Sequence, residues 1–291
     1  MVPRDTFALI VGSGASDLLH ANAQYLKRLG PVPTPFGLSA PLYRARMQDA
    51  HFLVLPRHGD VGEEVGAPWV NYRANVYALK EHGVWRILAW AGCAAVNLTL
   101  SVGEYILPHD IVDDTRGRET SFYKGTDLGC MRHHPVFCDE LRAAAESTLR
   151  MQGIPYHAQG TYVCTQGPRT ETPAEVKRLR SWGGDLVGMT MAPEVFLARE
   201  LEMCYVALCC VTNYAEGIRK REVRTGDPFG GVLEEAEKEA LAQARAGLLT
   251  IAASLSRGVL DDRTCLCSRA MERYREAGRI EEDWHTWIGK P

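Results

Sequence analysis

The sequence predicts an α/β fold in which helices flank a central mixed, mostly parallel β-sheet. Short apolar runs alternate along the chain with segments whose apolar residues recur at helical spacing, which is typical of this class. No internal repeat or Gly/Ser-rich linker interrupts the alternation before about residue 258. We therefore expect one domain over residues 1–257, followed by a charged C-terminal helical extension over residues 258–291.

Each expected element rests on its local pattern. Short runs rich in β-branched or bulky apolar residues predict six strands, at residues 6–11, 51–55, 85–90, 160–165, 185–188 and 204–212. Helical spacing of apolar residues predicts five helices, at residues 69–81, 135–151, 172–182, 192–201 and 232–256. Thr172, with Pro173 after it and Glu175 three residues on, predicts a capping box at the start of the third helix.

Composition narrows the class of function. A chain of 291 residues that is 46% hydrophobic and 24% charged is not disordered or fibrous. A net charge of −3 provides no basic field to attract nucleic acid or an anionic membrane. The longest apolar run, residues 204–211, is too short to cross a bilayer, and the N-terminus lacks a signal-peptide core. We expect a cytoplasmic enzyme that acts on small molecules.

The nine cysteines are expected to be reduced thiols in that compartment. Their spacing through residue 204, Cys138 and Cys204 included, does not match a zinc-ligand pattern. The one suggestive pair is Cys265-Leu266-Cys267, for which a redox role and an ordinary tail both stay open.

Two candidate anion sites follow expected strands. The segment Gly12-Ser13-Gly14-Ala15-Ser16 allows backbone N–H groups to converge on an anion, although it also suits a tight turn without a ligand. Arg57 and His58 follow the second strand. The Arg57 guanidinium suits phosphate, and His58 would supply a second donor in the same turn. Ligands gather at the carboxyl ends of strands in such sheets. If the two residues hold phosphate, removal of Arg57 is expected to raise the phosphate requirement and lower turnover about a hundredfold while leaving stability nearly unchanged. The alternative is a solvated loop.

Three further strand ends carry candidate substrate contacts. Glu171 could stabilise a helix N-terminus or accept N–H bonds from a flat heterocycle. Thr190 presents a hydroxyl where a strand breaks into a helix, and Met189 offers a soft surface for a sugar. Asn213, at the end of the most apolar strand, can donate and accept side by side.

In order along residues 7–255, these pieces resemble the trimeric purine nucleoside phosphorylase and 5′-methylthioadenosine phosphorylase family. The resemblance rests on separated motifs: PRHG at 56–59, VNYRAN at 70–75, SFY at 121–123, TQGPR at 165–169, GMT at 188–190, PE at 193–194 and LARE at 197–200. It implies a single-domain phosphorylase fold and a homotrimer. It also implies a pentosyltransferase of purine salvage, in which phosphate attacks C1′ of the sugar as the bond to the base loosens.

The resemblance assigns roles to single residues. The phosphate-binding set would be Ser13, Arg57, His58, Ala91, Gly92 and Thr190. The substrate-binding set would be Glu171, Met189, Asn213, Tyr214 and Ala215. Asn213 and His58 would be the catalytic residues. The resemblance implies neither a metal nor an organic cofactor, inorganic phosphate being the co-substrate.

The resemblance also indicates which purine base the protein would bind. Adenine-selective relatives place Asp at the positions of Asn213 and Ala215 and no acid at that of Glu171, so this chain resembles the methylthioinosine phosphorylases. Asn213 can donate to a 6-keto oxygen, and Glu171 can accept from N1–H. The expected substrates are therefore 5′-methylthioinosine, inosine or guanosine. The 5′ substituent stays open, and residues 221–232 are expected to form the wall beside it.

Two departures from the family pattern bear on activity. Ala91 lacks the polar side chain expected there, and Thr170 stands where relatives have Phe or Leu against the base. Two alternatives therefore remain: a methylthioadenosine phosphorylase, or a non-catalytic phosphorylase-like protein that binds nucleosides. Hydrolysis with water in place of phosphate is a third.

Overall fold

The structure is a computed structural model that describes residues 6–60, 64–220, 222, 232–259 and 262–288. Its centre is an 11-stranded sheet in which the order β10-β8-β13-β7-β1-β6-β5-β2 forms the main path. Beside this path, β12 pairs with β7 and β11, and β11 also pairs with β9. The strands are β1 (Phe7–Val11), β2 (Leu26–Gly30), β5 (Leu42–Met47), β6 (Ala50–Pro56), β7 (Arg86–Ala95), β8 (Tyr105–Ile106), β9 (Asp110–Asp114), β10 (Tyr156–His157), β11 (Thr161–Thr165), β12 (Leu186–Gly188) and β13 (Cys204–Tyr214). A separate two-stranded sheet joins β3 (Pro33–Thr34) and β4 (Gly37–Leu38).

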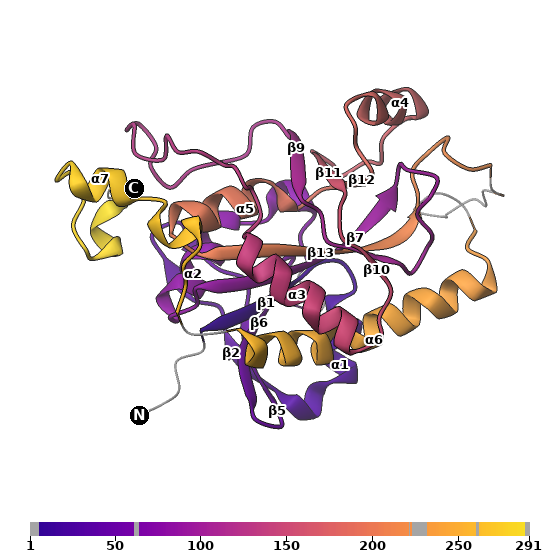
Figure 1. Ribbon diagram of the computed structural model, residues 1–291, viewed down its shortest axis with the longest axis horizontal. Helices are drawn as coiled ribbons and strands as arrows, with labels where there is room; N and C mark the ends of the chain where they lie inside the picture. The colour runs from indigo at the N-terminus through magenta and orange to yellow at the C-terminus, as the bar shows by residue number, and fades with distance from the viewer. Residues whose placement is uncertain (1–5, 61–63, 221, 223–231, 260–261, 289–291) are drawn as a thin grey trace.

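The central strands β6, β1, β7 and β13 run parallel, which confirms the predicted fold class. All five residues of β1 are buried, as are the first eight of β13, because helices cover both faces of these strands. In the view of Figure 1, α5 lies above β13, and α3 and α6 lie below it. The carboxyl ends of the four parallel strands therefore share one edge of a rigid core.

The helices fall close to their predicted positions. They are α1 (Ala15–Ala21), α2 (Tyr72–Glu81), α3 (Asp139–Met151), α4 (Pro173–Ser181), α5 (Met191–Glu200), α6 (Glu235–Gly258) and α7 (Glu272–Glu276), with short 3-10 helices η1 (Ala23–Tyr25), η2 (Ala67–Trp69), η3 (Leu266–Arg269) and η4 (Trp284–Trp287). The capping box of α4 is confirmed, since the Thr172 hydroxyl accepts from Glu175 N and Glu175 accepts from Thr172 N.

Several strands were not predicted, and β2 shows why. It exposes Lys27, Arg28 and Leu29 in succession, so its sequence lacks the alternation that marks a half-buried strand. Antiparallel pairing with β5 forms the strand instead. Such pairing depends on a neighbour from elsewhere in the chain and leaves little local signal.

The chain beyond α6 forms the short helices η3, α7 and η4, which lie at the opposite end of the molecule from α4 (Figure 1). Cys267, Met271, Tyr274 and Trp287 of this segment are buried against the main core. The exact boundary at residue 257 stays a prediction. Among the described residues, none of the helices is both long and apolar enough to span a membrane.

Candidate functional site

A cavity of about 850 Å³ opens at the carboxyl ends of the parallel strands. The loops after β1, β6 and β11 contribute to its wall, as do the ends of β7, β12 and β13 and one side of α6. Ten of the predicted site residues line it: Ser13, His58, Ala91, Gly92, Glu171, Met189, Thr190, Asn213, Tyr214 and Ala215. The structure thus brings together side chains that the sequence places more than 200 residues apart.

One end of the cavity is suited to an anion. The loop after β1 turns at Gly14, whose φ of 87° favours glycine, and exposes Ser13 to the cavity. Arg245 of α6 lies beside this turn: a Cβ atom on Gly14 would stand 3.7 Å from its Cζ. Lys238 of the same helix also lines the cavity. Sequence reasoning missed both cations, because a basic residue on an amphipathic helix ordinarily indicates a solvated face.

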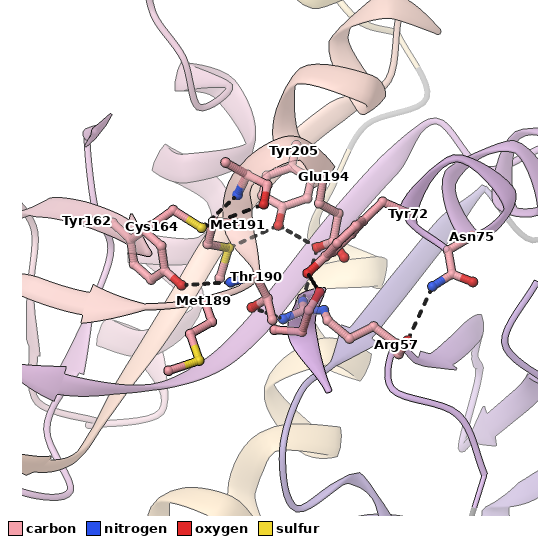
Figure 2. A network of polar contacts seen from close by, with 12 residues as sticks. Arg57, Tyr72, Asn75, Tyr162, Cys164, Met189, Thr190, Met191, Glu194 and Tyr205 are labelled. Carbon is pink, nitrogen blue, oxygen red and sulfur yellow. Dashed lines mark hydrogen bonds and ion pairs between the residues drawn. The ribbon is translucent and has the colours of Figure 1, made fainter. Parts of the chain in front are cut away.

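Arg57 corrects the expectation of a solvated loop. Its side chain is fully buried and lies outside the set of residues that line the cavity. Nη1 donates to Thr190 Oγ1 over 2.7 Å, and Nη2 forms an ion pair with Glu194 Oε1 over 3.0 Å. Figure 2 shows the guanidinium between these two side chains. Arg57 therefore reaches the cavity through Thr190, whose hydroxyl accepts from Arg57 and keeps its own proton for a ligand.

Glu194 completes this buried network. Its side chain is as inaccessible as that of Arg57, and Tyr205 Oη donates to its Oε1 over 2.6 Å (Figure 2). Burial raises the pKa of Glu194 above its ordinary value, although the charge of Arg57 opposes the shift. Because α5 carries Glu194 and begins beside Thr190, the pair fixes the start of that helix against the end of β6.

His58 lines the cavity, and one of its ring nitrogens forms a hydrogen bond within the protein. Its Nδ1 lies 2.8 Å from Val65 O, and since a carbonyl only accepts, Nδ1 carries the proton. Burial, together with the charge of Arg57, lowers the pKa of His58 to about 4. The imidazole is therefore neutral near pH 7 and has a lone pair on Nε2. This corrects the expectation of a second donor: His58 can accept a proton from a hydroxyl.

Glu171 is held in place by the strand that precedes it. Thr165 Oγ1, at the end of β11, donates to Glu171 Oε1 over 2.5 Å. The carboxylate keeps free acceptor positions on both oxygens. Glu175 already caps α4 by accepting from Thr172 N. A role at the N-terminus of α4 therefore does not explain why Glu171 lies on the cavity wall.

Asn213 reaches the cavity through a β-bulge. The register between β13 and β7 shifts between Val211 and Asn213, so Thr212 and Asn213 both line the cavity instead of pointing to opposite faces. Thr212 Oγ1 donates to Asn213 Oδ1 over 2.8 Å, and Asn213 Nδ2 donates to Tyr214 O over 3.0 Å. One N–H and one lone pair of the amide remain for a ligand.

The bulge also explains Gly92. A Cβ atom there would lie 2.8 Å from Thr212 Cγ2, so any side chain would force the Thr212 side chain to move. Ala91 and Thr170, the two departures from the family pattern, both line the cavity. Neither adds a large side chain, so the wall beside them stays open.

Arg118 is a residue that sequence reasoning did not find. Its guanidinium donates to Met189 O and Ala192 O, each over 2.7 Å, and to Gln166 O over 2.8 Å. It also contacts Thr165 O at 3.2 Å. One side chain thus connects the loop after β11 to the loop that carries Met189. No local pattern marks such a residue, because four of its acceptors are backbone carbonyls.

Part of the expected wall beside the 5′ carbon lies outside the described residues. Of residues 221–232, the structure describes Glu222 and Val232, and Val232 lines the cavity. Leu233 and Leu241 line it as well, which gives this side an apolar character.

Comparisons with known proteins agree with this geometry. Residues 6–250 match the sequence profile described as Phosphorylase superfamily. A protein of Dictyoglomus turgidum named probable 6-oxopurine nucleoside phosphorylase is 37% identical over 94% of this chain and 99% of its own. A Methanothermobacter thermautotrophicus protein named probable S-methyl-5′-thioinosine phosphorylase is 33% identical over 94% of this chain and 91% of its own.

A solved structure gives the same fold. The methylthioadenosine phosphorylase from Schistosoma mansoni in complex with tubercidin superposes with a TM-score of 0.74 at 26% identity, and the match covers 94% of this chain and 95% of that one.

Proposed function

Because the chain belongs to the phosphorylase superfamily, we propose that it cleaves 6-oxopurine nucleosides by phosphorolysis. The products are the free purine and ribose 1-phosphate or its 5-methylthio analogue. One observation carries the proposal: Glu171 and Asn213 line the same cavity as the anion-binding loop after β1. Residues that would bind the purine base and residues that would bind phosphate therefore line one cavity that a nucleoside can fill.

The purine edge explains the choice of base. Hypoxanthine and guanine present O6 as an acceptor and N1–H as a donor, so O6 can accept from Asn213 Nδ2 and N1–H can donate to Glu171. Adenine presents an amino group and a lone pair at these atoms, and both contacts are lost. Each mismatched buried contact costs about 1–3 kcal/mol.

The reaction forms a C1′–O bond to phosphate and breaks the C1′–N9 bond to the base. Positive charge develops on the sugar between phosphate and the departing purine. The leaving purine takes a proton from solvent at N7, and Asn213 Oδ1 accepts a hydrogen bond from the resulting N7–H group. Met189 lies on the cavity wall where the ribose would stand, held by Arg118 through its carbonyl.

Phosphate binding combines direct and indirect contacts. Ser13, Thr190 and the backbone around Gly92 would contact the ion, and Arg57 would polarise the Thr190 hydroxyl from behind. Arg245 would supply a charge at the cavity wall. The neutral His58 would accept a hydrogen bond from the one hydroxyl of HPO₄²⁻, which makes the anion more nucleophilic.

A substrate panel tests the proposal. Inosine, guanosine, adenosine, methylthioinosine and methylthioadenosine would each be incubated with and without phosphate, and release of free base followed. We expect phosphate-dependent release from the 6-oxo nucleosides, with the methylthio form preferred because Val232 and Leu233 give an apolar wall. Release that ignores phosphate would show hydrolysis instead. No release from any nucleoside that binds would show a non-catalytic protein.

Base selectivity gives a sharper test. We expect kcat/KM to favour methylthioinosine over methylthioadenosine by about a hundredfold or more, since two contacts are mismatched. The double variant Asn213→Asp with Glu171→Ser should erode this ratio, whereas Glu175→Ser, which changes an acid outside the cavity wall, should leave it intact. Equal cleavage of both nucleosides by the unmodified protein would contradict the assignment.

We also propose a cytoplasmic homotrimer. Trp69 is 65% exposed and Leu38 is 60% exposed, and a subunit contact would bury these large apolar side chains. Trp69 belongs to η2, whose first residue Ala67 lines the cavity, so a subunit contact there would lie beside the active site. Light scattering should give about three times the chain mass, and a stable monomer would contradict this part of the proposal.

A further inference from the structure

Four thiols from three distant parts of the chain meet at one place. One thiol immediately precedes α3, one begins β13, and two flank Leu266 in the segment after α6. Their Sγ atoms all lie within 4.8 Å of one another. The members of this four-cysteine cluster are Cys138, Cys204, Cys265 and Cys267.

The spacing of the sulfurs differs from that of a disulfide. Cys204 Sγ and Cys265 Sγ lie 3.3 Å apart, whereas a disulfide bond is about 2.0 Å long, and all four cysteines are free. No pair in the cluster is set apart from the rest, because each sulfur lies within 4.8 Å of the other three. A disulfide joins two sulfurs, but here four are mutually adjacent.

Four mutually adjacent sulfurs match the ligand shell of a tetrahedral metal ion. Zinc–thiolate bonds of about 2.3 Å place the sulfurs about 3.8 Å apart. The Cys204–Cys265 distance of 3.3 Å lies below this value, and the limit of 4.8 Å for all pairs lies above it. Small side-chain rotations would therefore suffice to bring all four sulfurs to bonding distance.

The surroundings favour thiolates. Arg263 Nη1 lies 3.9 Å from Cys204 Sγ, and the Lys80 ammonium is close enough to interact with the same sulfur. The Ser268 backbone N–H also interacts with Cys265. Three of the four thiols are buried, and Cys265 is partly exposed and gives an entry path.

We propose that the four-cysteine cluster binds one Zn²⁺ ion through four thiolates, as a structural site that attaches the C-terminal segment to the phosphorylase domain. Zinc suits a closed tetrahedral shell of sulfur ligands. Each thiol that is still protonated releases its proton to solvent on binding, and no electron is transferred. The site is independent of the proposed reaction, because none of its ligands lines the cavity.

This site assigns a role to the Cys265-Leu266-Cys267 pair. The segment that follows the pair is attached elsewhere too: Tyr274 Oη donates to Asp127 O over 2.8 Å, and Arg275 pairs with Glu202. Zinc would fix the start of the segment, and these contacts would fix its later part. Removal of the metal is thus expected to loosen residues 262–271 before the rest of the segment.

Metal content of the full chain tests the proposal. The protein would be purified with a thiol-free reductant and trace Zn²⁺, and zinc counted by mass spectrometry. We expect about one zinc per chain, and at least a fivefold loss in the Cys265→Ser, Cys267→Ser double variant. Cys130→Ser removes an exposed thiol outside the cluster and should keep the full zinc content. Cobalt substitution should give a thiolate charge-transfer band in the unmodified chain and the Cys130→Ser control.

A second measurement does not depend on folding of the variant. When a chelator removes the metal from the unmodified chain, four additional thiols should react with Ellman's reagent, and added Zn²⁺ should protect them again. Less than about one zinc per ten chains, or unchanged thiol reactivity, would overturn the site. One iron per chain would overturn the choice of zinc. A disulfide between two cluster members in the reduced preparation would overturn the metal assignment.

Discussion

The buried pair of Arg57 and Glu194 allows a quantitative prediction of stability. Both side chains have no exposed surface, and 3.0 Å separates Arg57 Nη2 from Glu194 Oε1. The Arg57→Met variant would leave a carboxylate buried without its cation. Breaking such a pair from one side costs about 3–5 kcal/mol, which shifts the folding equilibrium between about 100-fold and 4,000-fold. This replaces the sequence-based expectation that stability would hardly change.

The exposed pair of Arg28 and Asp60 provides a matched control. Its N–O distance of 2.8 Å is similar, but the Arg28 side chain is 53% exposed. Arg28→Met is therefore expected to cost less than about 1 kcal/mol. The double variant Arg57→Met with Glu194→Gln removes both charges and should be more stable than Arg57→Met alone.

Urea unfolding followed by tryptophan fluorescence measures these differences, since the chain has six tryptophans. All variants would be compared at one protein concentration, because association changes apparent stability. Equal losses for Arg57→Met and Arg28→Met would refute the reasoning from burial. A double variant less stable than Arg57→Met would also refute it, because the unpaired carboxylate would then not be the cause of the lost stability.

Two further predictions concern His58 and Arg118. Because the folded-state pKa of His58 is about 4 and the unfolded value is about 6.5, the unfolded chain binds more protons between these values. The free energy of unfolding should therefore fall as the pH drops from 6.5 to 4, by at most about 1.4 kcal/mol per pH unit. The urea midpoint of the His58→Gln variant should depend less steeply on pH than that of the unmodified chain. An identical slope in the two proteins would contradict the assigned shift. Arg118→Met should lower kcat/KM for nucleoside about tenfold or more, and Arg118→Lys should not restore it, because one ammonium does not span carbonyls of two loops. Unchanged steady-state kinetics would show that the loops hold their positions without Arg118.

The sequence by itself determined the elements that depend on a few neighbouring residues. The apolar runs at residues 7–11 and 204–211 form central strands because every residue in them can be buried, whatever lies beside them. The capping box at Thr172 follows from three adjacent residues. The motifs at strand ends also selected Glu171 and Asn213 as site residues, although β11 joins the core through the antiparallel pair of β12 and β7, so only the packed structure brings the two together.

Only the tertiary structure decided which of these side chains meet, and in what environment. Arg57 and His58 are neighbours in sequence, yet Arg57 is buried behind Thr190 and His58 lines the cavity. Strand β2 forms through its partner β5, and Arg118 acts through backbone carbonyls that carry no sequence signal. The four-cysteine cluster lacks a recognisable spacing because its thiols belong to three separate segments. The periodicity of helices and strands and the helix caps depend on neighbouring residues, whereas burial and long-range contacts depend on how all elements pack together.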